Sequence, residues 1–190
     1  MAAAALAAAE QQTLRLPGEA TTAVLIARLA RQLLDLDRQI KDTDKLITSR
    51  FRAHPTAEII ESLPGLGPIL GAEFIVATGG TVTGFATAGR LASYAGLVPV
   101  AQDSGRVTGN LRRPKRYNRR LRRVFYMAAL SSIRTGGPSR TFYDRKRGER
   151  LIHTQALLAL ARRLVDVLWA LLRDGRNFTP TAPQPAPTAA

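Results

Sequence analysis

The chain has 190 residues, 45% of them hydrophobic, so it can bury the core of one domain with an appendage or of two small domains. It has no cysteine and two histidines, which excludes a disulfide scaffold, a thiolate zinc site, a cysteine nucleophile and a histidine-rich metal site. The net charge of +14 favours a polyanionic partner, and residues 61–190 carry nearly all of it, with 20 Lys and Arg against 7 Asp and Glu.

The two ends of the chain are typical of segments without core material. Residues 1–19 are rich in alanine and predict a disordered leader, without the basic start of a signal peptide. Residues 177–190 predict a disordered Pro/Ala tail. The longest apolar stretch, residues 151–172, contains three charged side chains, so we expect no membrane span and a cytoplasmic, bacterial type of protein.

Residues 20–50 predict one long helix, within a dimerisation segment over residues 20–53. Its apolar seam repeats at alternating spacings of three and four residues, through Ile26, Leu29, Leu33, Leu36, Ile40, Thr43 and Ile47. Two interpretations stay open: the seam packs on the helix's own domain, or it pairs two chains as a coiled-coil homodimer. Thr43, a polar residue in the seam, would weaken that pairing and set its register.

A Pro-Gly-Leu-Gly turn between two short helices follows, with the second helix ending near Ala77. Gly65 and Gly67 permit positive φ angles and leave backbone N–H groups bare, which together with the second helix's dipole would seat a phosphate. Leu63 and Leu66 would anchor the turn in the core. The segment resembles the helix-hairpin-helix motif of DNA repair and recombination proteins, and an ordinary helix–helix turn is the alternative.

Loops and short elements fill the next thirty residues. A loop is expected over residues 79–86, a short helix over 87–94 with Gly96 as its C-terminal glycine, and an extended piece over 97–100. A polar, glycine-punctuated loop over residues 101–110 comes next.

A stretch of one charge sign follows this loop. Residues 104–143 contain 11 basic and no acidic residues, and a helix is expected to start near Tyr117 with Leu121, Val124, Phe125 and Ala128 facing inward. Solvated faces normally mix charge signs, so we interpret this stretch as a phosphate-binding surface. The candidate binding residues are Arg106, Arg112, Arg113, Lys115, Arg116, Arg119, Arg120, Arg122 and Arg123.

The last predicted helix runs from about Leu151 to Arg173. Its apolar stripe indicates a core element rather than a functional face. The predicted fold class is therefore mainly α: an N-terminal coiled-coil helix, then a compact helical domain over residues 54–176 that contains a helix-hairpin-helix motif.

The order of these blocks resembles one protein family. The matching segments are ESLPGLGPILGAEFIVATGG, FATAGRLASYAGLVPV, DSG, RRLRRVFYMAALSSIR and ALLALARRLVDVLWALL. They are similar to the C-terminal "transposase" half of DEDD-type, RuvC-containing insertion-sequence transposases related to the Piv DNA invertase. The resemblance covers about residues 20–175 and implies a DNA-binding, nucleoid-associated protein that acts in transposition or site-specific recombination.

The resemblance also implies a catalytic residue and a second ligand. In that family the serine of the Ser-Gly loop is the proposed nucleophile on a DNA phosphodiester, and its position here is Ser104. Family members of this type use a guide RNA, so RNA is an implied partner besides DNA. By local sequence alone, a serine beside a glycine is usually a turn residue. Asp103 is the one carboxylate near Ser104 in the sequence, and the neighbouring arginines would neutralise a phosphate.

The match departs from the family at its N-terminal half, because no set of four acidic residues that could bind Mg²⁺ precedes the hairpin. The acids on the heptad helix are explained better by a coiled-coil surface. We therefore expect a truncated transposase that is inactive alone, with no cofactor in this chain and Mg²⁺ only with a DEDD partner domain. The alternatives are a non-catalytic nucleic-acid-binding module acting as a dimer, and a structural oligomer whose charge aids solubility.

Overall fold

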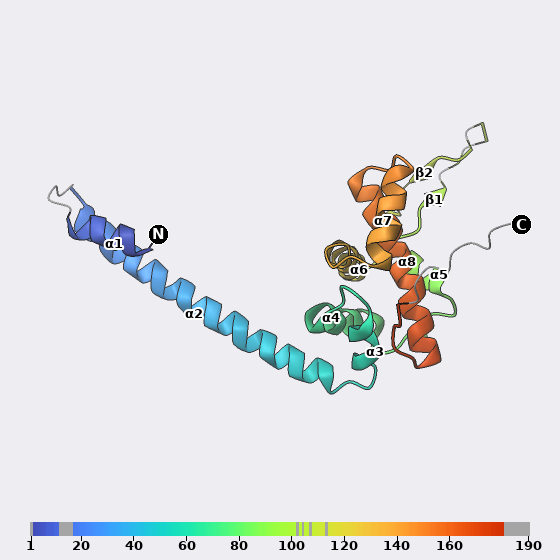
Figure 1. The fold of residues 1–190 in the computed structure, drawn as a ribbon, viewed down its shortest axis with the longest axis horizontal. Helices are drawn as coiled ribbons and strands as arrows, with labels where there is room; N and C mark the ends of the chain where they lie inside the picture. The colour runs from blue at the N-terminus through green and yellow to red at the C-terminus, as the bar shows by residue number, and fades with distance from the viewer. Residues whose placement is uncertain are drawn as a thin grey trace, which may run out of the picture. The chain divides into compact units, whose positions relative to one another are not determined.

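The structure is a computed structural model that describes residues 2–11, 17–101, 103, 105–106, 108–112 and 114–180. This part of the chain is mainly helical, as predicted, and it divides into two units, residues 1–45 and 46–190 (Figure 1). The elements are α1 (Ala2–Glu10), α2 (Glu19–Arg52), α3 (Ala57–Ser62), α4 (Pro68–Thr78), α5 (Ala88–Tyr94), β1 (Val100–Ala101), β2 (Leu111–Arg112), α6 (Arg119–Ser132), α7 (Pro138–Gly148) and α8 (His153–Asp174).

The first unit consists of α1 and most of α2. Within the predicted leader, Ala2–Glu10 form a helix, which agrees with the high helix propensity of alanine. The long helix starts and ends within two residues of the predicted bounds. Its last turns belong to the second unit, where the buried Phe51 ring occupies the space left by the missing side chain of Gly71.

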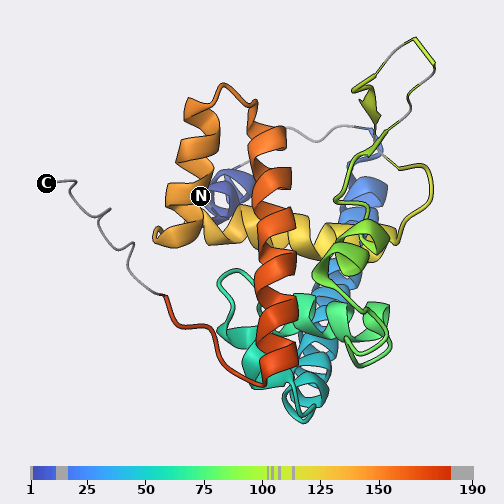
Figure 2. The same ribbon diagram turned by 90° about the vertical axis from the view of Figure 1, so that its right-hand side faces the viewer.

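Helix α8 is the centre of the second unit. It contacts α3, α5, α6 and α7, and α6 crosses it at a steep angle (Figure 2). The predicted core stripe of α8 is buried except for Val167, which is half-buried, and the four α6 residues that the sequence placed inward are buried as well. Among the described residues, no helix is both long and apolar enough to cross a membrane.

The turn between α3 and α4 packs on α6. Leu63 and Leu66 are buried, which confirms their predicted role as anchors. Gly65 has φ +89°, and a Cβ added there would overlap the backbone carbonyl of Ala128 in α6. Gly67 is different, because its backbone is extended and open space surrounds it. The sequence permits positive φ at both glycines; Gly65 adopts it and Gly67 does not.

Replacing Gly65 by alanine should destabilise the second unit by at least about 2 kcal/mol, because the new Cβ forces both a left-handed backbone and an overlap with α6. The matched variant Gly67→Ala should change the free energy of unfolding by less than about 1 kcal/mol. Urea unfolding followed by the fluorescence of Trp169, the chain's one tryptophan, measures both values. Equal stabilities of the two variants would contradict this packing of the turn.

Candidate nucleic-acid interface

The candidate interface lies where α6 begins. Asn118 caps this helix, and its side-chain oxygen accepts a hydrogen bond from the Leu121 N–H at 3.0 Å. The first helical residues are Arg119 and Arg120, and no acidic residue lies in the first turn. Cations at a helix N-terminus oppose the helix dipole. The local sequence therefore places positive charge where it costs stability.

Four of the six cations at this end of α6 have no acidic partner among the residues that the structure describes. Lys115, Arg116, Arg119 and Arg120 are exposed, and no carboxylate within the described ranges forms an ion pair with any of them. We call these four residues the basic cluster. Its charge is left to solvent and to any anion that binds there.

The other two cations bind the protein itself. Arg123 forms an ion pair with Glu73 of α4. Arg122 is half-buried; its guanidinium donates a hydrogen bond to the Gly96 carbonyl at 2.6 Å and lies 5.4 Å from the centroid of the Tyr117 ring. The structure thus separates predicted phosphate-binding residues into an exposed group and a pair with internal partners.

Asn118 joins α6 to the end of α5. Its backbone N–H donates to the Tyr94 carbonyl at 2.8 Å, and its side-chain amide donates to the Tyr94 hydroxyl at 3.1 Å. Gly96 has φ +67°, and a Cβ there would lie 2.5 Å from Cγ of Tyr117. We call Tyr94, Gly96, Tyr117, Asn118 and Arg122 the arm clamp, because they join the two ends of the segment between them.

That segment, residues 97–116, is called the basic arm. Its two short strands, β1 and β2, pair antiparallel, with Val100 opposite Arg112. Beyond the strands, the carboxylate of Asp103 accepts a hydrogen bond from the Asn110 N–H at 3.0 Å. The nearest carboxylate to Ser104 in the sequence is therefore engaged in closing the arm.

The predicted nucleophile, Ser104, lies outside the described residues, as does Arg113. Arg106 and Arg112 are exposed on the arm, and Arg112 Nε donates to the Asn110 side chain at 3.4 Å. The arm thus adds two described cations to those at the start of α6.

One large groove lies away from the predicted interface. A mainly apolar groove of about 950 Å³ lies between α7, α8 and residues 178–180, and no described residue of the predicted interface lines it. Among the described residues, no group of three or more His, Asp or Glu side chains could hold a metal ion. An extended anionic ligand can contact several of these separate, exposed cations at once.

Sequence reasoning missed the residues that hold the interface in place. Asn118 carried a local indication, because asparagine before a helix is a common N-cap. Tyr94 and Glu73 carried none, since they lie 24 and 50 residues from their partners Asn118 and Arg123. Only the tertiary fold brings them together.

Replacing Arg122 by glutamine should lower the free energy of unfolding by about 1.5 kcal/mol, because a charged hydrogen bond to a half-buried carbonyl is lost. Arg120→Gln removes the same charge from the same helix and should change stability by less than about 0.5 kcal/mol. Trp169 fluorescence during urea unfolding compares the two. An Arg122 variant as stable as the Arg120 variant would contradict the arm clamp.

Comparisons with known proteins bear on this region directly. Residues 57–144 match the model of the transposase IS116/IS110/IS902 family. The match runs from α3 into α7, so it includes the turn, the arm clamp, the basic arm and the basic cluster.

Three relatives extend the similarity over nearly the whole chain. The 44.8 kDa protein of insertion element IS116 from Streptomyces clavuligerus is 60% identical over 183 residues, which cover 96% of this chain and 46% of that protein. The 42 kDa protein of insertion element IS900 from Mycobacterium paratuberculosis is 57% identical, and the alignment covers 95% of this chain and 45% of that protein. The 43.6 kDa protein of insertion element IS110 from Streptomyces coelicolor is 37% identical, and the alignment covers 93% of this chain and 43% of that protein.

The chain spans less than half the length of each of these relatives. Its similarity to them is spread along both units, since the aligned segments cover more than nine tenths of the chain. Over residues 57–144, the chain is therefore similar to the transposase domain of the IS116/IS110/IS902 family.

Proposed function

We propose that this chain is the DNA-binding part of an insertion-sequence transposase, and that the basic cluster at the start of α6 binds DNA phosphates. The observation that carries the proposal is the set of four exposed cations that have no acidic partner in the described part of the chain and lie within the region that matches the transposase family. The relatives belong to insertion elements, which move as DNA.

The position of the cluster on its helix supports a phosphate ligand. Arg119 and Arg120 stand in the first turn of α6, where each cation costs about 0.3–1 kcal/mol against the helix dipole. A requirement for folding alone would favour acidic residues there. A bound phosphate reverses the balance, because it pairs with the guanidinium groups and with the free N–H groups of the first turn.

The arm clamp would hold the basic arm beside this phosphate site. Arg106 and Arg112 then extend the positive surface from the helix onto the arm. Gly65 and Gly67 would add a second phosphate contact if the turn before α4 acts as a helix-hairpin-helix. The exposed, extended Gly67 at the N-terminus of α4 suits that contact, whereas Gly65 faces α6.

Ser104 is our proposed nucleophile, by its place in the basic arm and by the family resemblance. Its hydroxyl oxygen would attack a DNA phosphorus, form a phosphoserine bond and release a strand hydroxyl. Within the described residues, no set of carboxylates fits a catalytic metal. In this proposal Mg²⁺-binding residues belong to a DEDD partner domain, and this chain supplies the positive charge around the phosphate.

Two further partners complete the proposal. A guide RNA would share the positive surface, since its phosphates carry the same charge as those of DNA. A second copy of the chain would pair through residues 20–50, where α2 carries its exposed apolar seam.

A non-catalytic, dimeric nucleic-acid-binding module is the second candidate function. The engagement of Asp103 with Asn110 favours it, because the carboxylate nearest to Ser104 in the sequence serves the closure of the arm. This module would bind DNA without forming a covalent bond.

Removing the exposed cations should reduce the salt dependence of DNA binding. The double variant Arg119→Gln, Arg120→Gln should lower the magnitude of the log–log slope of affinity against salt by about 1.8, or about 0.9 for each phosphate contact. The matched variant Arg28→Gln, Arg31→Gln removes the same charge from α2 and should leave the slope unchanged. Fluorescence anisotropy with a plain duplex measures both, and equal slopes would place the DNA-binding surface elsewhere.

Replacing Ser104 by alanine tests the nucleophile. The variant should keep its DNA affinity within about twofold, since one hydroxyl adds little to a charge-dominated interface. In a system complemented with a DEDD partner, it should lose recombination and the covalent protein–DNA adduct on a nicked substrate. If the unmodified chain forms no adduct there, the second candidate function is the correct one. Normal recombination by the variant would refute the role of Ser104.

A further inference from the structure

Helix α2 carries an apolar seam that the described chain leaves in water. The exposed fractions of Ile26, Leu29, Leu33, Leu36 and Ile40 lie between 51% and 68%. An isolated helix gains nothing by placing five large aliphatic side chains on one line. The seam therefore needs a partner with a matching apolar surface.

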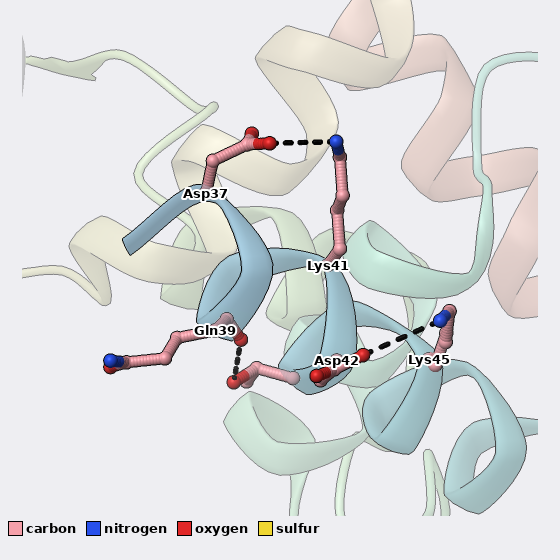
Figure 3. Close-up of polar contacts among 6 residues, drawn as sticks. Asp37, Gln39, Lys41, Asp42 and Lys45 are labelled. Atoms are coloured by element: carbon pink, nitrogen blue, oxygen red, sulfur yellow. Dashed lines mark hydrogen bonds and ion pairs between the residues drawn. The ribbon is translucent and has the colours of Figure 1, made fainter. Parts of the chain in front are cut away.

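The charged side chains of α2 leave the seam free. Lys41 pairs with Asp37 at 2.7 Å, and Lys45 pairs with Asp42 at 3.3 Å, each within the helix (Figure 3). Such pairs at three and four residues lie along the helix surface and need no second chain. The partner is thus selected by the apolar seam and by the residues beside it.

The spacing of the seam indicates a coiled coil. Alternating steps of three and four residues make a strict seven-residue repeat, which keeps facing a partner only when two helices wind left-handedly around each other. In heptad terms, the a positions are Ile26, Leu33, Ile40 and Ile47, and the d positions are Leu29, Leu36 and Thr43.

The residue types at these positions favour two parallel strands. Isoleucine fills three of the four a positions, and leucine fills two of the three d positions. β-Branched residues at a with leucine at d are the combination found in parallel dimers. A parallel, in-register pair also uses all seven layers from Ile26 to Ile47. The antiparallel register that pairs Ile26 with Thr43 buries only six of these seven seam residues in each helix and leaves Ile47 without a partner.

Thr43 fits this pairing despite its polarity. Its hydroxyl donates a hydrogen bond to the Gln39 carbonyl of its own helix at 2.7 Å, so no unsatisfied donor enters the seam. In a parallel pair, Thr43 meets Thr43 of the second copy. A shift of one heptad would place one Thr43 against Leu36 and the other against Arg50, so the threonine pair favours the in-register arrangement.

The residues beside the seam agree with the parallel arrangement. Position g of one helix then lies next to position e of the following heptad in the other, which places Gln32 beside Asp37 and Gln39 beside Asp44 of the second copy. An amide can donate to a carboxylate in both cases. The antiparallel register that pairs Leu33 with Thr43 would instead bring the Asp37 carboxylates of the two copies together.

We propose that α2 forms a parallel, in-register, two-stranded coiled coil with α2 of a second copy. This deepens the dimer of the proposed function by specifying its partner, its direction and its register. Because the helices run in the same direction, both chains leave the coiled coil at the same end. Two nucleic-acid-binding domains are then tethered near one another, so binding of one to DNA raises the effective concentration of the other.

Single cysteines test direction and register, because the natural chain has none. Thr43→Cys keeps every aliphatic side chain of the seam, and under mild oxidation the full chain should form a reducible dimer. In the control variant Lys45→Cys, the cysteine lies on the opposite side of the helix. This variant should form at least tenfold less disulfide-linked dimer than Thr43→Cys does. In the antiparallel register that pairs Ile26 with Thr43, two copies of residue 43 lie about 26 Å apart. In the one that pairs Leu33 with Thr43 they lie about 15 Å apart, and both distances are too long for a disulfide.

Each outcome decides the proposal. A Thr43→Cys dimer, with a sedimentation mass of two chains for the unmodified protein, supports it. Cross-linking of Thr43→Cys only to an Ile26→Cys variant would overturn it in favour of antiparallel helices, and a mass of one, three or four chains would overturn it as well. DNA binding of the same samples is measured separately. A dimer that does not bind DNA contradicts the proposed function but not the coiled coil.

Discussion

The start of α6 concentrates positive charge that the fold does not neutralise. Six cations lie between Lys115 and Arg123, and four of them, the basic cluster, have no carboxylate partner among the described residues. The helix dipole adds to the same field instead of opposing it. This cost is tolerable because the inner face of α6 is fully buried against α4 and α8. The core thus stabilises a helix whose first residues carry exposed positive charge.

The arm clamp holds the basic arm next to the start of α6. Arg122 and Asn118 donate hydrogen bonds to residues at the end of α5. These bonds hold both ends of the basic arm next to α6. A basic residue in this stretch can therefore serve either the ligand or the scaffold. The two roles are distinguished by their partners, a backbone carbonyl for Arg122 and solvent for Arg120.

The local patterns of the sequence predicted the helices well, because buried stripes at helical spacing and a one-signed charge run are visible along the chain. Leu121, Phe125 and the stripe of α8 are examples. What could not be predicted depends on the tertiary fold. Nothing in the sequence marked Glu73 as the partner of Arg123, or Gly65 as the residue that touches α6. The sequence permitted positive φ at both Gly65 and Gly67, and only the fold shows that Gly67 does not adopt it.

The exposed start of α6 as a DNA-binding surface is the claim on which the proposed function depends. Chemical modification of arginines, mapped by mass spectrometry with and without duplex DNA, tests it directly. Bound DNA should protect Arg116, Arg119 and Arg120 from the reagent and leave Arg28 and Arg31 of α2 as reactive as before. Unchanged reactivity at the start of α6 under conditions where the protein is fully bound would contradict the claim.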